Sequence, residues 1–166
     1  AFLIGLSYSS VLGFLSIYAD NLGLSTAGAF FFVVYALIIT FTRPFAGQIF
    51  DAKGENAVMY PSFIFLAIGL LTLSYTTTSF MLLLSGALIG LGYGTFMSNG
   101  QAVCLKLVES SKVSIALSTY FIGLDLGLGF GPYALGTVHS FLSYSGIYVL
   151  CAVLTVAVAI LYAIFY

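Results

Sequence analysis

The feature that most constrains this chain is a run of 50 residues, 56–105, that contains no charged side chain. An apolar α-helix needs about 20 residues to cross roughly 30 Å of hydrocarbon. The run is therefore long enough for two such helices. The hydroxyl-rich segment 76–79 in its middle favours a turn and a helix start. We therefore predict two membrane-spanning helices joined by a short connection.

The composition extends this interpretation to the whole chain. Hydrophobic residues make up 61% of the sequence and charged residues only 5%, whereas soluble domains average about 25% charged residues. The net charge of −1 leaves no basic surface for a phosphate backbone. Both cysteines stand in apolar stretches, and no metal-ligand spacing occurs. These facts exclude a soluble domain, a disordered chain, a nucleic-acid binder and a disulfide scaffold. They predict a polytopic protein in contact with membrane lipid, without a metal or cofactor.

The charged residues mark the ends of six apolar segments. Their continuous apolar character, without the alternation of an outer-membrane barrel strand, favours an all-α bundle of six transmembrane helices. We expect helices at about 1–19, 25–50, 57–75, 80–106, 112–138 and 143–166. All three lysines lie in or beside the connections 51–56 and 107–111. The positive-inside rule then places these two loops, and both termini, in the cytoplasm of a cell carrying the protein in its plasma (inner) membrane.

Glycine spacing predicts which helices approach one another closely. Glycines recur every four residues in helices 80–106 and 112–138, the pattern that lets helices pack backbone to backbone in lipid. We expect these two helices to be central, and the greasier helices 57–75 and 143–166 to face lipid. Polar, glycine-rich and greasy helices follow in the same order twice. This order predicts a 3+3 inverted repeat.

The second connection carries a recognisable signature. Gly47, Asp51 and Gly54 match the cytoplasmic pattern G-x-x-x-D-R/K-x-G-R/K-R/K, although Glu55 and Asn56 replace basic positions. The pattern resembles that of the major facilitator superfamily. The segment 90–102 looks like the tenth helix of its drug and sugar efflux members, and the segment 119–136 looks like the eleventh.

The chain thus resembles the C-terminal six-helix half of a twelve-helix transporter of the drug:proton antiporter type. The resemblance implies a secondary active transporter rather than an enzyme. It implies proton-coupled efflux of small, partly apolar compounds by alternating access, with an N-terminal six-helix half of the same transporter as partner. An uptake permease, a half-transporter that works alone as a homodimer, and a structural or oligomeric six-helix membrane protein remain open as alternatives.

Asp125 is the most informative single residue. It lies near the middle of helix 112–138, where a charged aspartate costs about 2.5–3.5 kcal/mol on the insertion scale. Such residues usually face a cavity or a partner and mark ion or substrate paths. Asp125 is therefore a candidate for proton coupling. The alternative is an aspartate that fastens its helix to a neighbour by a hydrogen bond.

Weaker candidates line the expected cavity. In the family that the chain resembles, the first helix of each triplet faces the pocket, which selects helices 1–19 and 80–106. On these two helices and on helix 112–138, the substrate-cavity candidates are Tyr8, Tyr93, Asn99 and Tyr120. Asn99 has the alternative of bonding to a neighbouring helix.

The loop signature suggests a gate. Asp51 ends a helix, where the negative end of the helix dipole disfavours a carboxylate, so it requires a cationic or dipolar partner. The partners available are Arg43, Lys106, or the positive N-terminus of helix 57–75 or of a neighbour's helix, and Gly54 supplies the tight turn. The resemblance implies a latch that holds the cytoplasmic side in one state. A solvated loop charge is the alternative.

Other six-helix classes lack their motifs here. A rhomboid-type protease needs a G-x-S-G sequence, but Ser85 follows two leucines. No Asn-Pro-Ala loop of an aquaporin occurs, and the connections are too short for the helical extensions of an ABC permease. The transporter interpretation is therefore the one that the motifs favour.

Overall fold

The computed structural model describes all 166 residues as helices joined by short connections, without a strand. The helices are α1 (Phe2–Asn21), α2 (Ser25–Lys53), α3 (Asn56–Ser74), α4 (Ser79–Ile89), the π-helical turn η1 (Gly90–Gly94), α5 (Thr95–Lys106), the short 3-10 turn η2 (Ser110–Lys112), α6 (Val113–His139) and α7 (Tyr144–Phe165). The segments α4, η1 and α5 follow one another directly and form one span. The structure thus contains six helices long and apolar enough to cross a membrane. The predicted all-α, six-helix bundle is confirmed.

Local chemistry sets the helix ends. Thr78 Oγ1 accepts a hydrogen bond from the Met81 amide at the start of α4, and Ser143 Oγ accepts one from Gly146 at the start of α7. These side chains satisfy amides that have no partner in a first helical turn. Gly23 and Gly54 adopt φ angles of 70° and 85°, which only glycine adopts without strain. They reverse the chain after α1 and α2.

One predicted connection is much shorter than expected. The predicted loop 51–56 is largely helical, because α2 continues through Lys53 and α3 begins at Asn56. Only Gly54 and Glu55 lie outside the two helices. The segment 51–53 contains no helix breaker, so the helix ends only where Gly54 takes its positive φ.

The six spans pack in a pattern that is the same in both triplets. Helix α1 packs on α6, as α2 packs on the span α4–η1–α5, and α3 packs on α7. The first triplet is α1, α2 and α3, and the second is α4–η1–α5, α6 and α7. If each span is exchanged for its counterpart in the other triplet, the same three pairings result. The pairings are those of a 3+3 repeat.

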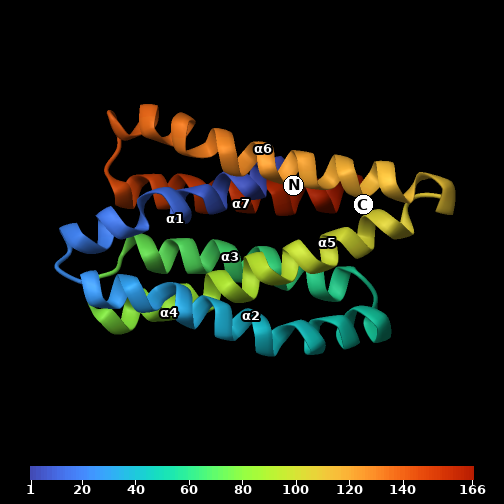
Figure 1. The fold of residues 1–166 in the computed structure, drawn as a ribbon, viewed down its shortest axis with the longest axis horizontal. Helices are drawn as coiled ribbons and strands as arrows, with labels where there is room; N and C mark the ends of the chain where they lie inside the picture. The colour runs from blue at the N-terminus through green and yellow to red at the C-terminus, as the bar shows by residue number, and fades with distance from the viewer.

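The surface of α1, α2, α5 and α6 that faces the viewer in Figure 1, in front of α3 and α7, is called the front face.

Glycines make the closest approach between α1 and α6. A Cβ atom on Gly127 would overlap the carbonyl oxygen of Phe2, and one on Gly131 would overlap the Ser9 side chain. A Cβ atom on Gly5 would likewise overlap the carbonyl oxygen of Leu124. The predicted glycine packing is therefore real. Its partner is the first helix of the chain.

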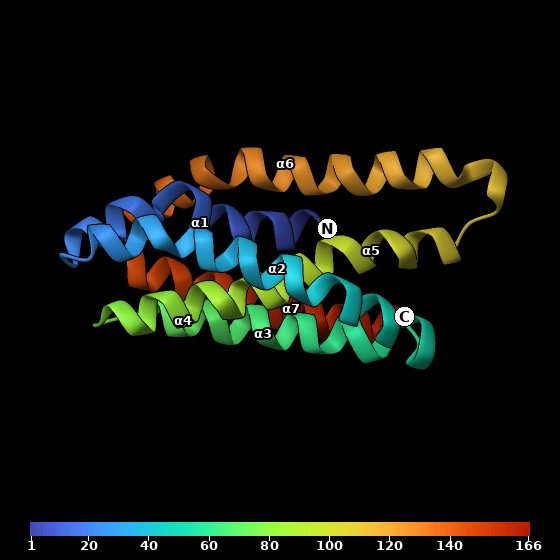
Figure 2. The same ribbon diagram turned by 60° about the horizontal axis from the view of Figure 1, so that its bottom comes forward.

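The predicted depth of two helices is wrong. Helix α6 was expected to be central, but only 17% of its most apolar window is buried, whereas the corresponding share of α3 is 56%. The reason is that the Gly127 side of α6 contacts α1, while Gly129 and Gly136 on other sides meet no atom within 4 Å. Helix α6 lies along one edge of the bundle, as Figure 2 shows. Helix α3 is enclosed by α4, η1 and α7.

The lysine-bearing connections lie at the same end of the bundle. Figure 1 shows the α2–α3 and α5–α6 connections at one end, and the other three connections at the opposite end. The first end is called the basic end below, because Lys53, Lys106 and Lys112 all belong to it.

Candidate functional site

Three tyrosines from three different spans form a stack at the centre of the molecule. The rings of Tyr8 (α1) and Tyr93 (η1) lie 3.8 Å apart with an interplanar angle of 13°. The ring of Tyr35 (α2) lies 5.6 Å from that of Tyr8, at 17°. Tyr8 and Tyr93 are buried, and Tyr35 is half-buried. The tyrosine stack therefore joins α1, α2 and η1, with Tyr35 as its outer member.

The stack member Tyr93 lies on a π-helical turn that is rich in glycine. Helix 80–106 was expected to be continuous, but the Gly-Leu-Gly-Tyr-Gly segment forms the π turn η1. A Cβ atom on Gly90 would lie 3.0 Å from the carbonyl oxygen of Tyr35, and Gly94 similarly contacts Ile39. Glycine thus lets α2 come against the turn that carries Tyr93. Short π segments inside helices occur frequently at functional sites.

The other cavity candidates are buried and satisfied within the chain. The Tyr120 hydroxyl lies 3.3 Å from the carbonyl oxygen of Phe96, to which it donates, in space left by Gly100. Asn99 Nδ2 donates to the carbonyl oxygen of Thr95, at 3.0 Å, in its own helix. The Asn99 side-chain amide therefore bonds within α5. Tyr120 is the residue that ties α6 to α5.

Asp125, on the same helix as Tyr120, is exposed. It follows the buried Leu124 on α6, and its carboxylate accepts no hydrogen bond from the chain. It lies within electrostatic range of Tyr93. A fastening hydrogen bond from Asp125 to a neighbouring helix is thus absent.

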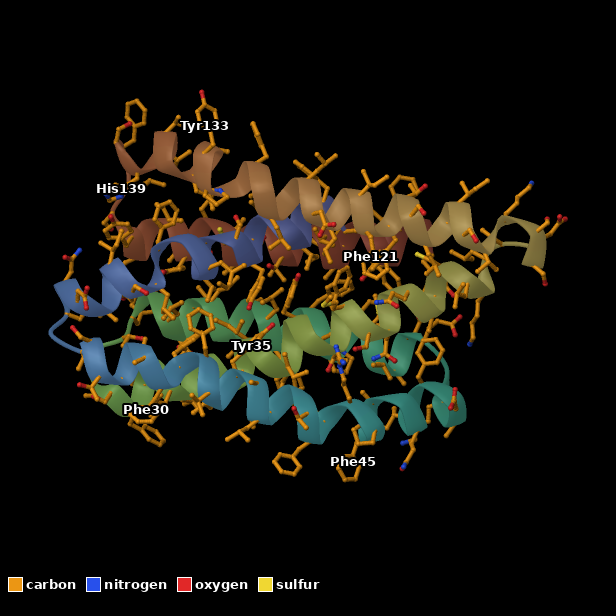
Figure 3. The ribbon with its side chains drawn as sticks, viewed as in Figure 1. Phe30, Tyr35, Phe45, Phe121, Tyr133 and His139 are labelled. Carbon is orange, nitrogen blue, oxygen red and sulfur yellow. The ribbon has the colours of Figure 1, made fainter.

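Figure 3 shows how the front face is bordered. Tyr35 and Phe121 lie on the edges of α2 and α6 that face each other, whereas Phe30 and Tyr133 lie on the outer edges. Arg43, exposed on α2, lies within electrostatic range of Tyr35. Sequence reasoning missed Tyr35, because a tyrosine in an apolar helix carries no signal until its stacking partners are known.

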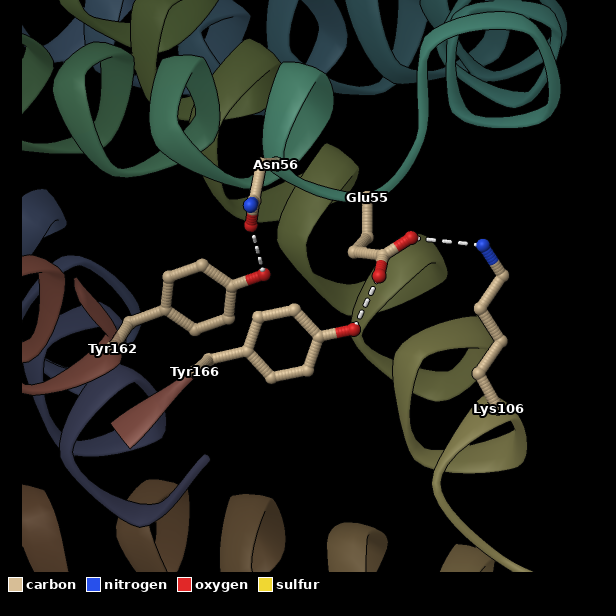
Figure 4. A network of polar contacts seen from close by, with 5 residues as sticks. All are labelled: Glu55, Asn56, Lys106, Tyr162 and Tyr166. Carbon is tan, nitrogen blue, oxygen red and sulfur yellow. Dashed lines mark hydrogen bonds and ion pairs between the residues drawn. The ribbon is translucent and has the colours of Figure 1, made fainter. Parts of the chain in front are cut away.

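A polar network closes the basic end (Figure 4). Lys106 Nζ lies 2.8 Å from Glu55 Oε2 and 4.6 Å from the centre of the Phe50 ring. The Tyr166 hydroxyl donates to the other oxygen of Glu55. The neighbouring Tyr162 hydroxyl donates to Asn56 Oδ1 at 2.9 Å. The network connects the ends of α5 and α7 to the α2–α3 connection.

The network also sets two proton affinities. Hydrogen bonds from Lys106, which has the larger effect, and from Tyr166 lower the pKa of Glu55 to about 2. The same carboxylate raises the pKa of Tyr166 to about 12. Glu55 is therefore anionic at every physiological pH. Sequence analysis assigned Glu55 no role, because it stands at a position that the loop signature reserves for a basic residue.

The expected ion pairs of Asp51 do not form. Lys106–Glu55 is the ion pair of this structure, so neither Lys106 nor Arg43 contacts Asp51. The reason is local. Helix α2 ends before Gly54, so Glu55 lies outside the helix and reaches Lys106. Asp51 remains on the exposed side of α2. Gly54 occupies the turn with φ 85°, and Gly47 has open space around its Cα.

No metal-binding constellation is present among the 166 residues. No group of three or more His, Cys, Asp or Glu side chains is placed to hold a metal ion. Cys104 and Cys151 are free thiols, the first half-buried and the second buried. The chemistry of the site therefore rests on tyrosine rings, one arginine and one carboxylate.

Comparison with known proteins gives a consistent picture. The family model of the Major Facilitator Superfamily matches residues 1–166. Multidrug resistance protein MdtG of Citrobacter koseri is 31% identical over 141 residues, which is 81% of this chain and 34% of that protein. The MdtG proteins of Salmonella arizonae and Proteus mirabilis are 30% and 28% identical, over 81% and 79% of this chain and 35% and 34% of their own lengths. The chain thus spans about a third of these relatives. No solved structure matches it.

Proposed function

Because the chain belongs to the major facilitator superfamily, we propose that it forms the C-terminal six-helix half of a secondary active transporter. The transporter exports small, partly apolar compounds in exchange for protons, by alternating access. One observation supports the proposal: Asp125, an exposed carboxylate midway along α6, lies within electrostatic range of Tyr93 in the tyrosine stack. The relatives' printed name, multidrug resistance protein, supports efflux as the direction of transport.

The position of Asp125 suits a proton carrier. A carboxylate at the middle of a membrane span is too costly to face lipid, so it faces a partner or a water-filled cavity. Proton binding removes its charge and therefore lowers the cost of closing that cavity. The cavity can then open and close according to whether Asp125 is protonated. This coupling of charge to conformation is what proton exchange requires.

The aromatic residues suit the proposed substrates. Tyr35 and Phe121 are half-buried at the front face and offer ring surface to a flat, partly apolar compound. Tyr8 and Tyr93 lie behind Tyr35 and hold its ring in place by stacking. Arg43 and Asp125 are the charged groups that border this surface. Such a surface favours neutral or amphipathic compounds over multivalent ions.

The partner is the N-terminal half of the same transporter. Helices α2 and α6 are the least buried spans, with 11% and 17% of their most apolar windows covered. A second six-helix half laid against the front face would cover them and enclose the cavity. With the basic end inside the cell, both termini of this half are cytoplasmic and the transporter resides in the plasma membrane.

Asp51 then serves as a gate residue. Its carboxylate has no ion-pair partner in this half, and it lies at the basic end on the exposed side of α2. A cation or a helix N-terminus of the partner half is the group that it is placed to meet. Arg43, Gly47, Gly54 and Lys106 shape the same end of the bundle.

The test is transport by the full-length protein in proteoliposomes. An imposed proton gradient should drive a lipophilic fluorescent compound across the membrane in the wild type. Asp125→Asn should lower that rate by at least about tenfold and remove its dependence on pH. The control is Glu109→Gln, an exposed carboxylate in the α5–α6 connection, which should transport normally. Unchanged rate and pH dependence in Asp125→Asn would contradict the proposal.

A further inference from the structure

A hollow lies between α2 and α3, away from the front face. Its volume is about 210 Å³, and Leu91 and Thr95 close its inner end. Phe45 and Ile49 from α2 and Phe65 from α3 are among its walls. Figure 3 shows Phe45 on the outer edge of α2, opposite the edge that carries Tyr35. This α2–α3 groove is therefore separate from the surface proposed for transport.

The groove has hydrocarbon walls. Thr42 and Ser62 line it, but their hydroxyls each donate to a carbonyl oxygen of their own helix at 2.6 Å. Their polar atoms are thus already satisfied. Phe45, Ile49 and Phe65 expose between 37% and 64% of their surface. In a membrane, the apolar molecule that reaches such a groove from the side is the acyl chain of a lipid.

A lysine lies about one helical turn beyond the last groove residue of α2. The groove residues Thr42, Ala46 and Ile49 are spaced by four and three residues along α2. Lys53 follows Ile49 by four more, so it continues the same stripe at the basic end. It is exposed and takes part in no ion pair or hydrogen bond. A positive charge therefore lies where a lipid headgroup would sit if its chain entered the groove.

The nearby carboxylates do not compete for this lysine. Asp51 precedes Lys53 by two residues, which places it about 200° around the helix. Glu55 is engaged by Lys106 and Tyr166. The charge of Lys53 thus remains available to an anion. Basic residues at the cytoplasmic ends of membrane helices recognise anionic headgroups.

We propose that the α2–α3 groove binds one anionic phospholipid, with an acyl chain between α2 and α3 and its phosphate on Lys53. This lipid site goes beyond the proposed transport function and requires neither a substrate nor a proton gradient. It ties α3 to the end of α2 at the two-residue turn of Gly54 and Glu55.

The test is native mass spectrometry of the full-length transporter, purified in detergent and supplied with phosphatidylglycerol or phosphatidylethanolamine. The wild type should retain phosphatidylglycerol more strongly. Lys53→Gln should weaken that retention about fivefold, which corresponds to about 1 kcal/mol for one interfacial lysine. Lys112→Gln is the matched control, since Lys112 is also exposed and unpaired at the basic end. It should retain lipid like the wild type.

A second variant tests the groove itself. Ala46→Phe fills the hollow and should lower retention of both lipids, whereas Val33→Phe adds bulk to an exposed position of α2 and should not. Equal retention by wild type and Lys53→Gln would overturn the proposal. So would an equal loss in Lys112→Gln, because it would indicate only general surface charge. Unchanged retention in Ala46→Phe would show that the N-terminal half or bulk lipid covers the groove, and would overturn it as well.

Discussion

The α1–α6 crossing and the polar network at the basic end hold the bundle together by opposite means. At the crossing, Gly5 and Gly127 bring two backbones into contact without intervening side chains, and Gly131 leaves room for the Ser9 side chain. At the basic end, Glu55 and Lys106 join three segments through long side chains that are 23% and 49% exposed. The first contact tolerates no added atom. The second can break and form again.

The difference teaches where this half is rigid and where it is adjustable. In lipid there is no hydrophobic force between helices, so close van der Waals contact must hold them together. Outside the hydrocarbon, exposed ion pairs contribute little to stability. We therefore assign the crossing to folding and the polar network to conformational adjustment.

The largest effect is expected at the crossing. Gly127→Ala places a Cβ atom against the carbonyl oxygen of Phe2 and should destabilise the protein by about 2 kcal/mol. Gly129→Ala, two residues along the same helix, meets no atom within 4 Å and should be neutral or slightly stabilising. Thermal unfolding in detergent measures both variants. Equal melting temperatures would remove the crossing from the folding account.

An intermediate effect is expected in the tyrosine stack. Tyr93→Leu removes a ring that lies 3.8 Å from that of Tyr8 and should cost about 1 kcal/mol beyond the loss of buried area. Tyr93→Phe keeps the ring and should retain nearly all of the stability. Thermal unfolding of the two variants gives the comparison. If Phe is as damaging as Leu, the hydroxyl and not the stacking is what matters.

The smallest effect is expected at the basic end and depends on pH. The pKa of Glu55 is lowered from an ordinary 4.5 to about 2. Its contribution to stability is therefore complete above pH 4.5 and is lost as the pH falls through the range from 4.5 to 2. The wild type should lose slightly more stability than Glu55→Gln over that range. Parallel melting curves of the two proteins against pH would contradict the assigned contact.

The sequence predicted the spans well because the charged residues are so few. Uncharged runs have to be long enough to cross the hydrocarbon, and this requirement fixed the number and approximate position of the helices. The glycine spacing likewise predicted close packing. It did not identify the neighbour, because a small residue allows contact without selecting a partner. Helix α6 was therefore expected at the centre, although it lies along an edge.

The details of the site were beyond sequence reasoning for physical reasons. The π turn at Gly90–Gly94 adds one residue to a helical turn, and its sequence is equally compatible with a regular helix. Tyr35 gains its place only through contact with Tyr8 on another span. Glu55 and Lys106 are 51 positions apart in sequence. A pairing of this kind depends on tertiary structure, so Asp51 of the loop signature was expected as a partner of Lys106 in place of Glu55.

The central claim is that the front face lines a water-filled cavity of the full-length transporter. It is tested most directly by cysteine accessibility, in a background with Cys104 and Cys151 replaced. A hydrophilic thiol reagent should modify Phe121→Cys and Asp125→Cys on α6, and transported compound should protect them. The exposed Val153→Cys and Ile160→Cys on α7 should stay unmodified, because they face lipid. Modification of the α7 positions, with the α6 positions inert, would contradict the account.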